Sequence, residues 1–185
     1  VRNQADWLAS AGYLVAAPDL FKGRTFLGCL RRMILDFMRG EGPLFDRVEG
    51  TRQWLAQHEQ STGKIGVIGF CFGGGFALLL APRGGYDVAS VNYGTLPENL
   101  ETFLQGECPI VTSYGALDRT LKGAAPKLEA ALTTLGIDHD VKEYADTDHA
   151  EDDIPFLINV ISVVFGGGAF QPVIIFDRGQ GARGL

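Results

Sequence analysis

The chain has 185 residues, of which 46% are hydrophobic and 21% are charged. This composition is typical of one globular domain and excludes disordered, collagenous and coiled-coil proteins. Sixteen basic against twenty-two acidic residues give a net charge of −6, and without a basic run nucleic acid is not expected as a partner.

Apolar spacing and turn residues divide the first third of the chain into four predicted elements. A helix is predicted over 3–11, and a short strand over 13–17 that Pro18 and Asp19 end. Two further helices, over 26–39 and 44–58, are predicted to cover a sheet.

The middle of the chain continues as strands and helices in alternation. Strands are predicted over 64–70, 87–93, 109–114 and 139–144, and helices over 72–80 and 122–135. The strands are short or nearly continuous in apolar residues, as burial on both faces requires. The fold class is therefore α/β, with a mostly parallel sheet covered on both faces, in one domain over 1–185.

Three cysteines, Cys29, Cys71 and Cys108, are too few to form the disulfide framework of a small secreted protein. A reducing compartment, the cytoplasm, is the expected location. Two uncharged stretches, 65–82 and 154–176, are long enough to examine as membrane spans. Glycines interrupt the first, and prolines, polar residues and three consecutive glycines interrupt the second, so no membrane span is expected.

The sharpest motif is the segment 69–74, Gly-Phe-Cys-Phe-Gly-Gly, between a predicted strand and a predicted helix. It has the form of a nucleophile elbow with cysteine as nucleophile. In such a turn the positions two before and two after the nucleophile accept only glycine or alanine, and Gly69 and Gly73 satisfy this. The turn would aim Cys71 at a helix N-terminus, which favours a thiolate, and the N–H of Phe72 would stabilise an oxyanion.

A cysteine nucleophile needs a base and an acid that orients the base. In this fold the order along the chain is nucleophile, acid, base. Asp118 follows the strand over 109–114 and is the candidate acid, and His149 follows the strand over 139–144 and is the candidate base. The alternatives are that Cys71 is a small buried side chain in a glycine-rich turn and that His149 is an exposed loop residue.

The competing residues fit these roles less well. His58 lies before the nucleophile on a polar helix face, and His139 begins a strand, at the wrong end of a parallel sheet for catalysis. Cys29 and Cys108 are interpreted as structural. Surface positions are the simplest interpretation of the acidic residues around the histidine, which are Asp138, Asp140, Asp146 and Asp148. Metal spacing and a phosphate-binding loop are both missing from the sequence, so no metal and no cofactor are expected.

These motifs resemble the dienelactone hydrolase family, α/β hydrolases with a cysteine nucleophile. The resemblance lies in 16–21, 66–74, 115–118 and 144–149, within about 1–150. It implies that Cys71, Asp118 and His149 form a catalytic triad that hydrolyses small esters or lactones without a cofactor.

The sequence departs from the family at three places. The chain begins at the helix that follows the family's N-terminal strands, so the fold is expected to be incomplete on that side, without the second oxyanion donor and the carboxylate that tunes the cysteine. The family usually has an aromatic residue shortly after the histidine, where this chain has the acidic segment 150–153. The glycine-rich segment 177–185 is a poor helix former, where the family ends in an amphipathic helix.

The predicted function is hydrolysis of a small-molecule ester or lactone through a thioester acyl-enzyme. One rival is a non-catalytic or thiol-sensing domain in which Cys71 is oxidised or capped. Another is a hydrolase of the same fold that acts on peptides or thioesters, because the fold does not fix the substrate. The oligomeric state is left open.

Overall fold

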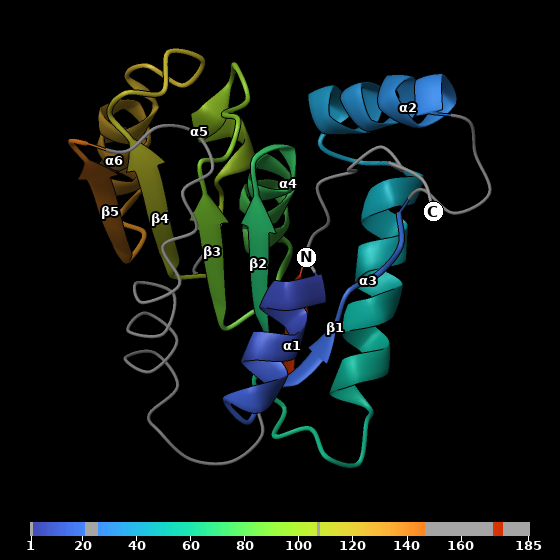
Figure 1. The fold of residues 1–185 in the computed structure, drawn as a ribbon. Helices are drawn as coiled ribbons and strands as arrows, with labels where there is room; N and C mark the ends of the chain where they lie inside the picture. Colours follow the sequence, from blue (N-terminus) through green and yellow to red (C-terminus); the bar gives the residue numbers. More distant parts are fainter. Residues whose placement is uncertain (1, 21–25, 107, 147–171, 176–185) are drawn as a thin grey trace.

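The computed structural model describes residues 2–20, 26–106, 108–146 and 172–175. Six parallel strands form one sheet in the order β1-β6-β2-β3-β4-β5. Strands β2, β3, β4 and β5 lie side by side in Figure 1. Their bounds are β1 Leu14–Ala16, β2 Gly66–Phe70, β3 Val88–Asn92, β4 Ile110–Gly115, β5 His139–Tyr144 and β6 Pro172–Ile175. Because all strands run the same way, their carboxyl ends share one edge of the sheet, where α/β proteins bind ligands.

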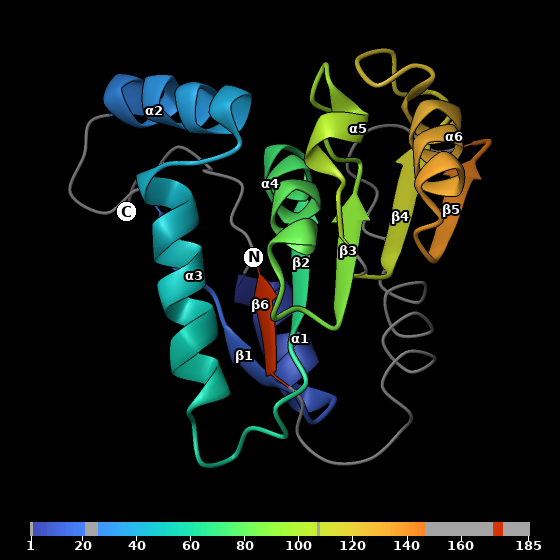
Figure 2. The ribbon, with the colours of Figure 1, turned by 180° about the vertical axis from the view of Figure 1, so that it is seen from behind.

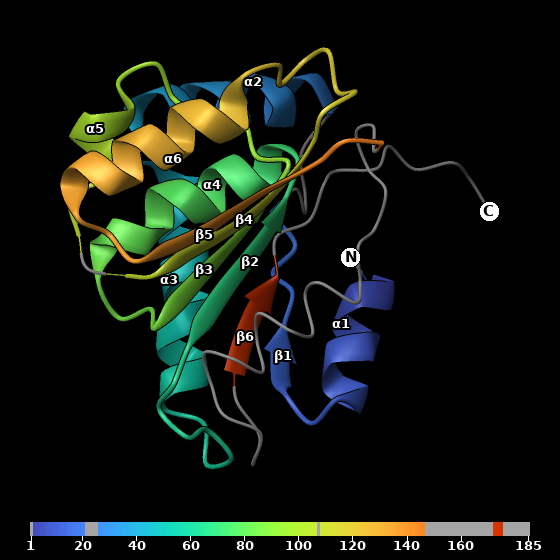
Figure 3. The ribbon, with the colours of Figure 1, turned by 90° about the vertical axis from the view of Figure 1, so that its left-hand side faces the viewer.

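Helices cover both faces of this sheet (Figure 3). Helix α1, Arg2–Ser10, packs on β1 from one side. On the other side, α3 contacts β1 and β6, α4 contacts β2 and β3, and α6 contacts β4 and β5; their bounds are Pro43–Ala56, Phe72–Leu80 and Ala124–Leu135. The predicted α/β fold with a parallel, doubly covered sheet is confirmed.

Burial along each strand follows its place in the sheet. Every residue of β2 and β3 is buried, as the continuous apolar pattern predicts for central strands. Strand β5 lies at an edge, and its exposed residues include Asp140 and Lys142, which form an ion pair at 3.3 Å. The main core lies between the sheet and the α3–α4–α6 layer, where Phe45 stacks on Phe76 with ring centroids 4.6 Å apart.

Strand β6 is the one strand of the described residues that the sequence analysis did not predict. It lies between β1 and β2, where Val173 pairs with Val15 on one side and Gly66 on the other (Figure 2). A segment from the far end of the chain thus joins the first strand to the rest of the sheet. The four residues end in a Val-Ile-Ile run typical of a strand, but the surrounding stretch 154–176 was interpreted only as an uncharged segment. Among the helices of the described residues, none is long and apolar enough to cross a membrane.

The prediction that helix α2, Phe26–Arg39, covers the sheet is wrong. It packs on α3 and lies across one end of that helix (Figure 1). The ring of Phe37 reaches the first turns of α4, with its centroid 5.0 Å from that of Phe72 and 5.9 Å from that of Phe76. Phe37 of α2 is therefore buried against other helices, whereas Ile34 and Met38 are exposed, and periodicity alone does not distinguish a helix partner from a sheet.

A buried carboxylate joins α2 to α3. Asp36 is 1% exposed, and its Oδ2 accepts a hydrogen bond from the backbone N–H of Leu44 in the first turn of α3 at 3.1 Å. The residue before that helix, Gly42, has φ +133°, and a Cβ there would lie 2.5 Å from the Asp36 carboxylate. The cap of α3 is thus supplied by another helix, and glycine leaves room for it.

We expect Asp36→Ala to lower the free energy of unfolding by about 1–2 kcal/mol, because a buried N–H at a helix N-terminus loses its acceptor. Urea unfolding followed by circular dichroism measures the change. Asp46→Ala is the matched control, since Asp46 is an exposed acid in the same first turn and should cost only about 0.3–1 kcal/mol. Equal losses in the two variants would contradict the capping role.

Candidate active site

Cys71 lies at the turn between the carboxyl end of β2 and the first residue of α4. Its backbone has φ 55° and ψ −123°, a conformation that non-glycine residues rarely adopt, and its side chain is half-buried. Strained conformations of this kind persist only where the surrounding structure enforces them, and they cluster at functional sites. The turn has the strand, strained residue and helix that define a nucleophile elbow.

Gly69 shows why this turn needs a residue without a side chain. A Cβ at Gly69 would lie far inside the van der Waals distance of the carbonyl oxygen of Gly73, which belongs to the backbone of α4. The expectation that alanine would also fit at this position is therefore wrong, because the obstacle is a helix backbone that cannot move aside. The glycine allows α4 to begin directly against β2.

Two backbone hydrogen bonds hold Cys71 in place. Its N–H donates to the carbonyl oxygen of Asn92 at the end of β3, at 3.0 Å, and its own carbonyl oxygen accepts from the N–H of Gly75 at 3.3 Å. The first bond ties the turn to the neighbouring strand and the second is part of α4. Cys71 is therefore held by β2, which precedes it in the chain, and by its hydrogen bonds to β3 and α4.

Phe72 follows Cys71 as the first residue of α4. The N–H groups of a helix's first turn have no acceptor within the helix, so they are available to an anion. The half-buried ring of Phe72 packs against Phe37 of α2 and Phe76 one turn later in α4. These contacts hold the side chain of the residue whose N–H is the predicted oxyanion donor.

Asp118 follows β4 at the carboxyl edge of the sheet, as the sequence analysis predicted. It is 2% exposed, and its Oδ1 accepts hydrogen bonds from the N–H and Oγ1 of Thr120 at 2.8 and 2.6 Å. One strand, β3, separates β2 from β4, so the two strand ends lie roughly 10 Å apart. An imidazole between Cys71 and Asp118 would bridge such a gap.

The candidate base, His149, lies outside the described residues, as does Asp148. Strand β5, which leads toward it, ends at Tyr144 beside the end of β4, where Tyr144 accepts a hydrogen bond from the N–H of Ala116 at 2.9 Å. The chain toward His149 thus leaves the sheet from the strand next to the one that leads to Asp118. The assembly of Cys71, Asp118 and His149 into a triad stays a prediction.

His139 lies at the predicted start of a strand, whereas His58, predicted on a helix face, lies just beyond the end of α3. His139 begins β5, at the amino end of the sheet, with Nδ1 2.6 Å from the carbonyl oxygen of Ile137. His58 follows α3, and its ring contacts Trp54 with centroids 5.3 Å apart. Neither is at the edge that carries Cys71.

Cys108 is buried next to the start of β4, in agreement with its predicted structural role. Burial, reinforced by the negative charge of Asp87, raises the pKa of its thiol to about 12. At neutral pH this thiol is protonated and shielded, so it is a poor nucleophile. Cys29 lies within α2.

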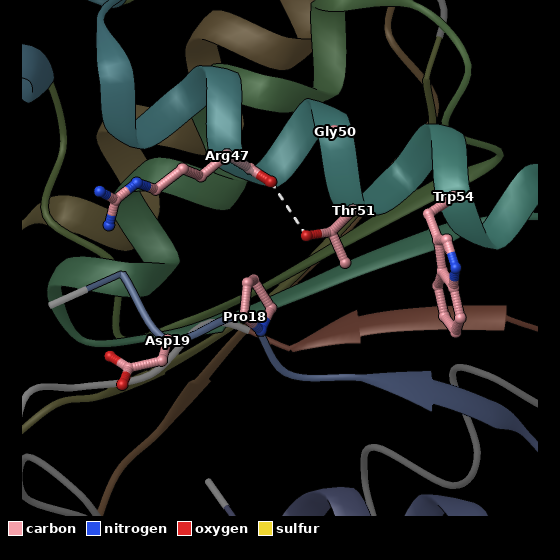
Figure 4. Close-up of a pocket in the computed structure, with 6 residues that line it drawn as sticks. All are labelled: Pro18, Asp19, Arg47, Gly50, Thr51 and Trp54. Atoms are coloured by element: carbon pink, nitrogen blue, oxygen red, sulfur yellow. Dashed lines mark hydrogen bonds between the residues drawn. The ribbon is translucent and has the colours of Figure 1, made fainter. Parts of the chain in front are cut away.

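A separate hollow of about 560 Å³ lies between α3 and the segment that follows β1 (Figure 4). Figure 4 shows the side chains of Arg47 and Asp19 at one end and the indole of Trp54 at the other. Arg47 also donates to the carbonyl oxygen of Leu20 at 3.0 Å, which ties the segment to α3. The lining residues, Pro18, Asp19, Arg47, Gly50, Thr51 and Trp54, do not include Cys71 or Asp118.

Sequence reasoning missed the buried polar residues beneath the turn, above all Asn92. The sequence did contain a sign of this residue, because Asn92 is the one amide in a strand whose other residues are small or apolar. A polar side chain in a fully buried strand requires partners, and those partners come from strands distant in sequence.

The parallel sheet, the helices on both faces and the strained cysteine turn define an α/β protein whose strand–turn–helix has the geometry of a nucleophile elbow. Comparison with known proteins gives the family: residues 1–152 match the Dienelactone hydrolase family, so the chain belongs to this family. This agrees with the resemblance found over about 1–150.

Two sequence relatives show how much of the family's length the chain shares. A carboxymethylenebutenolidase from Pseudomonas putida is 25% identical over 142 residues, which cover 69% of this chain and 58% of that protein. A relative from Saccharolobus solfataricus is 34% identical over 91 residues, which cover 49% of this chain and 35% of that protein. The chain thus spans less than two thirds of the length of either relative.

A solved structure supports the fold. Esterase PE8 superposes with a TM-score of 0.51 at 19% identity, over 65% of this chain and 63% of that one.

Proposed function

We propose that this chain is a hydrolase domain for small esters or lactones, formed by residues 1–185, with Cys71 as nucleophile. The observation that carries the proposal is the position of Cys71, half-buried in a strained turn between β2 and α4 at the carboxyl edge of the sheet. Membership of the Dienelactone hydrolase family supports it, as does the carboxymethylenebutenolidase name of the Pseudomonas relative.

In the proposed reaction His149 takes the proton of the Cys71 thiol, and Sγ attacks the acyl carbon of the substrate. The N–H of Phe72 stabilises the negative charge on the carbonyl oxygen. The C–O bond then breaks, the protonated His149 gives its proton to the leaving alkoxide, and a thioester remains on Cys71. Water, deprotonated by His149, then cleaves the thioester and releases the acid, while Asp118 orients the imidazole throughout.

The test is a single-turnover reaction with an activated aryl ester that records phenolate release and the intact mass of the protein. We expect a stoichiometric burst and an acyl adduct that peptide mapping places on Cys71, followed by steady release. Cys71→Ala should lose both signals, and His149→Ala should lose steady release.

Folded protein that forms no adduct, or activity that survives in Cys71→Ala, would remove the proposal. Iodoacetamide labelling gives an independent reading of the same thiol. Cys71 should react and Cys108 should not, because burial keeps the latter protonated.

A further inference from the structure

A buried cluster of polar side chains lies beneath the Cys71 turn, on three adjacent strands. Asn92 at the end of β3 is 3% exposed. Its Nδ2 donates to the carbonyl oxygen of Gly69 on β2 and to Oγ of Ser90, both at 3.2 Å. Its Oδ1 accepts from Oγ of Ser113 on β4 at 2.8 Å. One amide thus connects the strand of the nucleophile to the strand that leads to the acid.

The orientation of this amide is fixed by its partners. The carbonyl oxygen of Gly69 can only accept a hydrogen bond, so the nitrogen of Asn92 must face it and the oxygen must face Ser113. The reversed amide would place two acceptors against each other within a buried site. Asparagine therefore supplies a donor toward β2 and an acceptor toward β4 from two separate atoms, whereas alanine supplies neither.

The backbone of the same residue also holds the nucleophile. The carbonyl oxygen of Asn92 accepts the N–H of Cys71 at 3.0 Å, and the next residue, Tyr93, donates its N–H to the carbonyl oxygen of Ser113 at 2.6 Å. Tyr93 also has a positive φ, 39°, so strained residues end both β2 and β3. Asn92 bonds the chain two residues before Cys71 and at Cys71 itself, which spans the strained part of the turn.

We propose that Asn92 is a positioning residue that holds the Cys71 turn in its strained conformation and in register with the strand that carries Asp118. The proposal rests on the proposed function, because it takes Cys71 as the nucleophile. Asn92 is 3% exposed and bonds the backbone of the turn, so it acts through the position of Cys71. Loss of its hydrogen bonds lets the turn relax, and the thiol then leaves the attacking position for part of the time.

The decisive variant is Asn92→Asp, because its effect depends on pH. An ionised carboxylate only accepts hydrogen bonds and faces the Gly69 carbonyl oxygen unfavourably, whereas the protonated acid donates to it. Burial against that oxygen favours the protonated form and so raises the pKa of the introduced acid. The reaction rate of the variant relative to the unsubstituted protein should therefore rise as pH falls.

Titratable neighbours do not account for such a pH dependence. Of the elements packed on β3, β2 and α4 contain no titratable side chain, and β4 contains only Tyr114, whose pKa is raised by burial. Cys71 follows β2 and Tyr93 follows Asn92. Both are present in the unsubstituted protein, but the ionised carboxylate of the variant would also act on the Cys71 thiolate by its charge, so the ratio is compared with that of Asn92→Ala, which introduces no charge.

The experiment measures the burst rate with an aryl ester and the rate of iodoacetamide labelling of Cys71, from about pH 5.5 to about pH 8.5, which spans a raised carboxyl pKa. At the upper end we expect Asn92→Asp to react at least about tenfold more slowly than the unsubstituted protein. The deficit should shrink toward the lower end. Asn92→Ala should be slow at every pH. Melting temperatures establish that each variant is folded.

Thr112→Val is the matched control. Thr112 lies on β4 beside Ser113 and is fully buried, and its Oγ1 has no hydrogen-bond partner among the described residues. The substitution changes a buried side chain without touching the turn and should leave both rates unchanged. A pH-independent deficit in Asn92→Asp, or none, would overturn the proposal.

Labelling separates this result from the proposed function. If the unsubstituted protein is labelled on Cys71 but never acylated, the hydrolase proposal fails. The labelling ratio of Asn92→Asp still decides the role of Asn92.

Discussion

Gly69→Ala is expected to destabilise the protein by about 3 kcal/mol or more and to abolish the reaction of Cys71 with an aryl ester. The added methyl group would overlap the Gly73 carbonyl oxygen, and relief requires α4 to move away from β2. Overpacking against side chains costs about 1–3 kcal/mol, and here the obstacle is backbone. Urea unfolding measures the stability, and the ester burst measures the geometry of the turn.

Gly50→Ala is the control for this substitution. Gly50 lies in α3, and a Cβ there would meet nothing within 4 Å. In a helix interior this change should stabilise the protein by about 0.5–1 kcal/mol and leave the burst unchanged. A Gly69→Ala protein with normal stability and a normal burst would contradict the close approach of α4 to β2.

Asp118→Asn is expected to lower ester turnover by about 10³- to 10⁴-fold, the size of effect seen when an orienting aspartate loses its charge in other triads. The amide oxygen of asparagine can still accept both hydrogen bonds from Thr120, so the local turn should be kept. The loss would then come from the missing charge, which stabilises the imidazolium of His149. Steady-state kinetics and the melting temperature together distinguish the two effects.

Two further variants serve as controls for Asp118→Asn. Asp138→Asn removes an exposed carboxylate just before β5, at the amino end of the sheet, and should leave turnover unchanged. Thr120→Val removes the hydroxyl that donates to Asp118 but leaves the charge of Asp118 in place. It should therefore lower ester turnover far less than Asp118→Asn does. Turnover of Asp118→Asn within about threefold of the unsubstituted protein would show that another group orients the base.

Most of the fold could be predicted because its elements are defined by local patterns. Helices α2 and α4 and strand β5 begin and end at the predicted residues, and the other predicted elements agree within two residues. The short elements α5, Leu100–Phe103, and the 3-10 turn at Ala81–Arg83 were missed, since a single turn has too few residues to show a period.

The sequence by itself determined the features of the site that lie close together in the chain. The glycines around Cys71, the strand before it and the helix after it occupy fifteen consecutive residues, so the elbow could be predicted from them. Asp118 was placed by its distance from the preceding strand, and the structure puts it, buried, at the predicted edge.

The tertiary structure alone decided which distant segments meet. Strand β6 enters the sheet between β1 and β2, α2 packs on other helices, and Asn92 bonds Gly69 and Ser113, about twenty residues away on either side. These pairings depend on strand order and on long-range hydrogen bonds, whose partners no local period or spacing specifies, because the chain must first fold before they become neighbours.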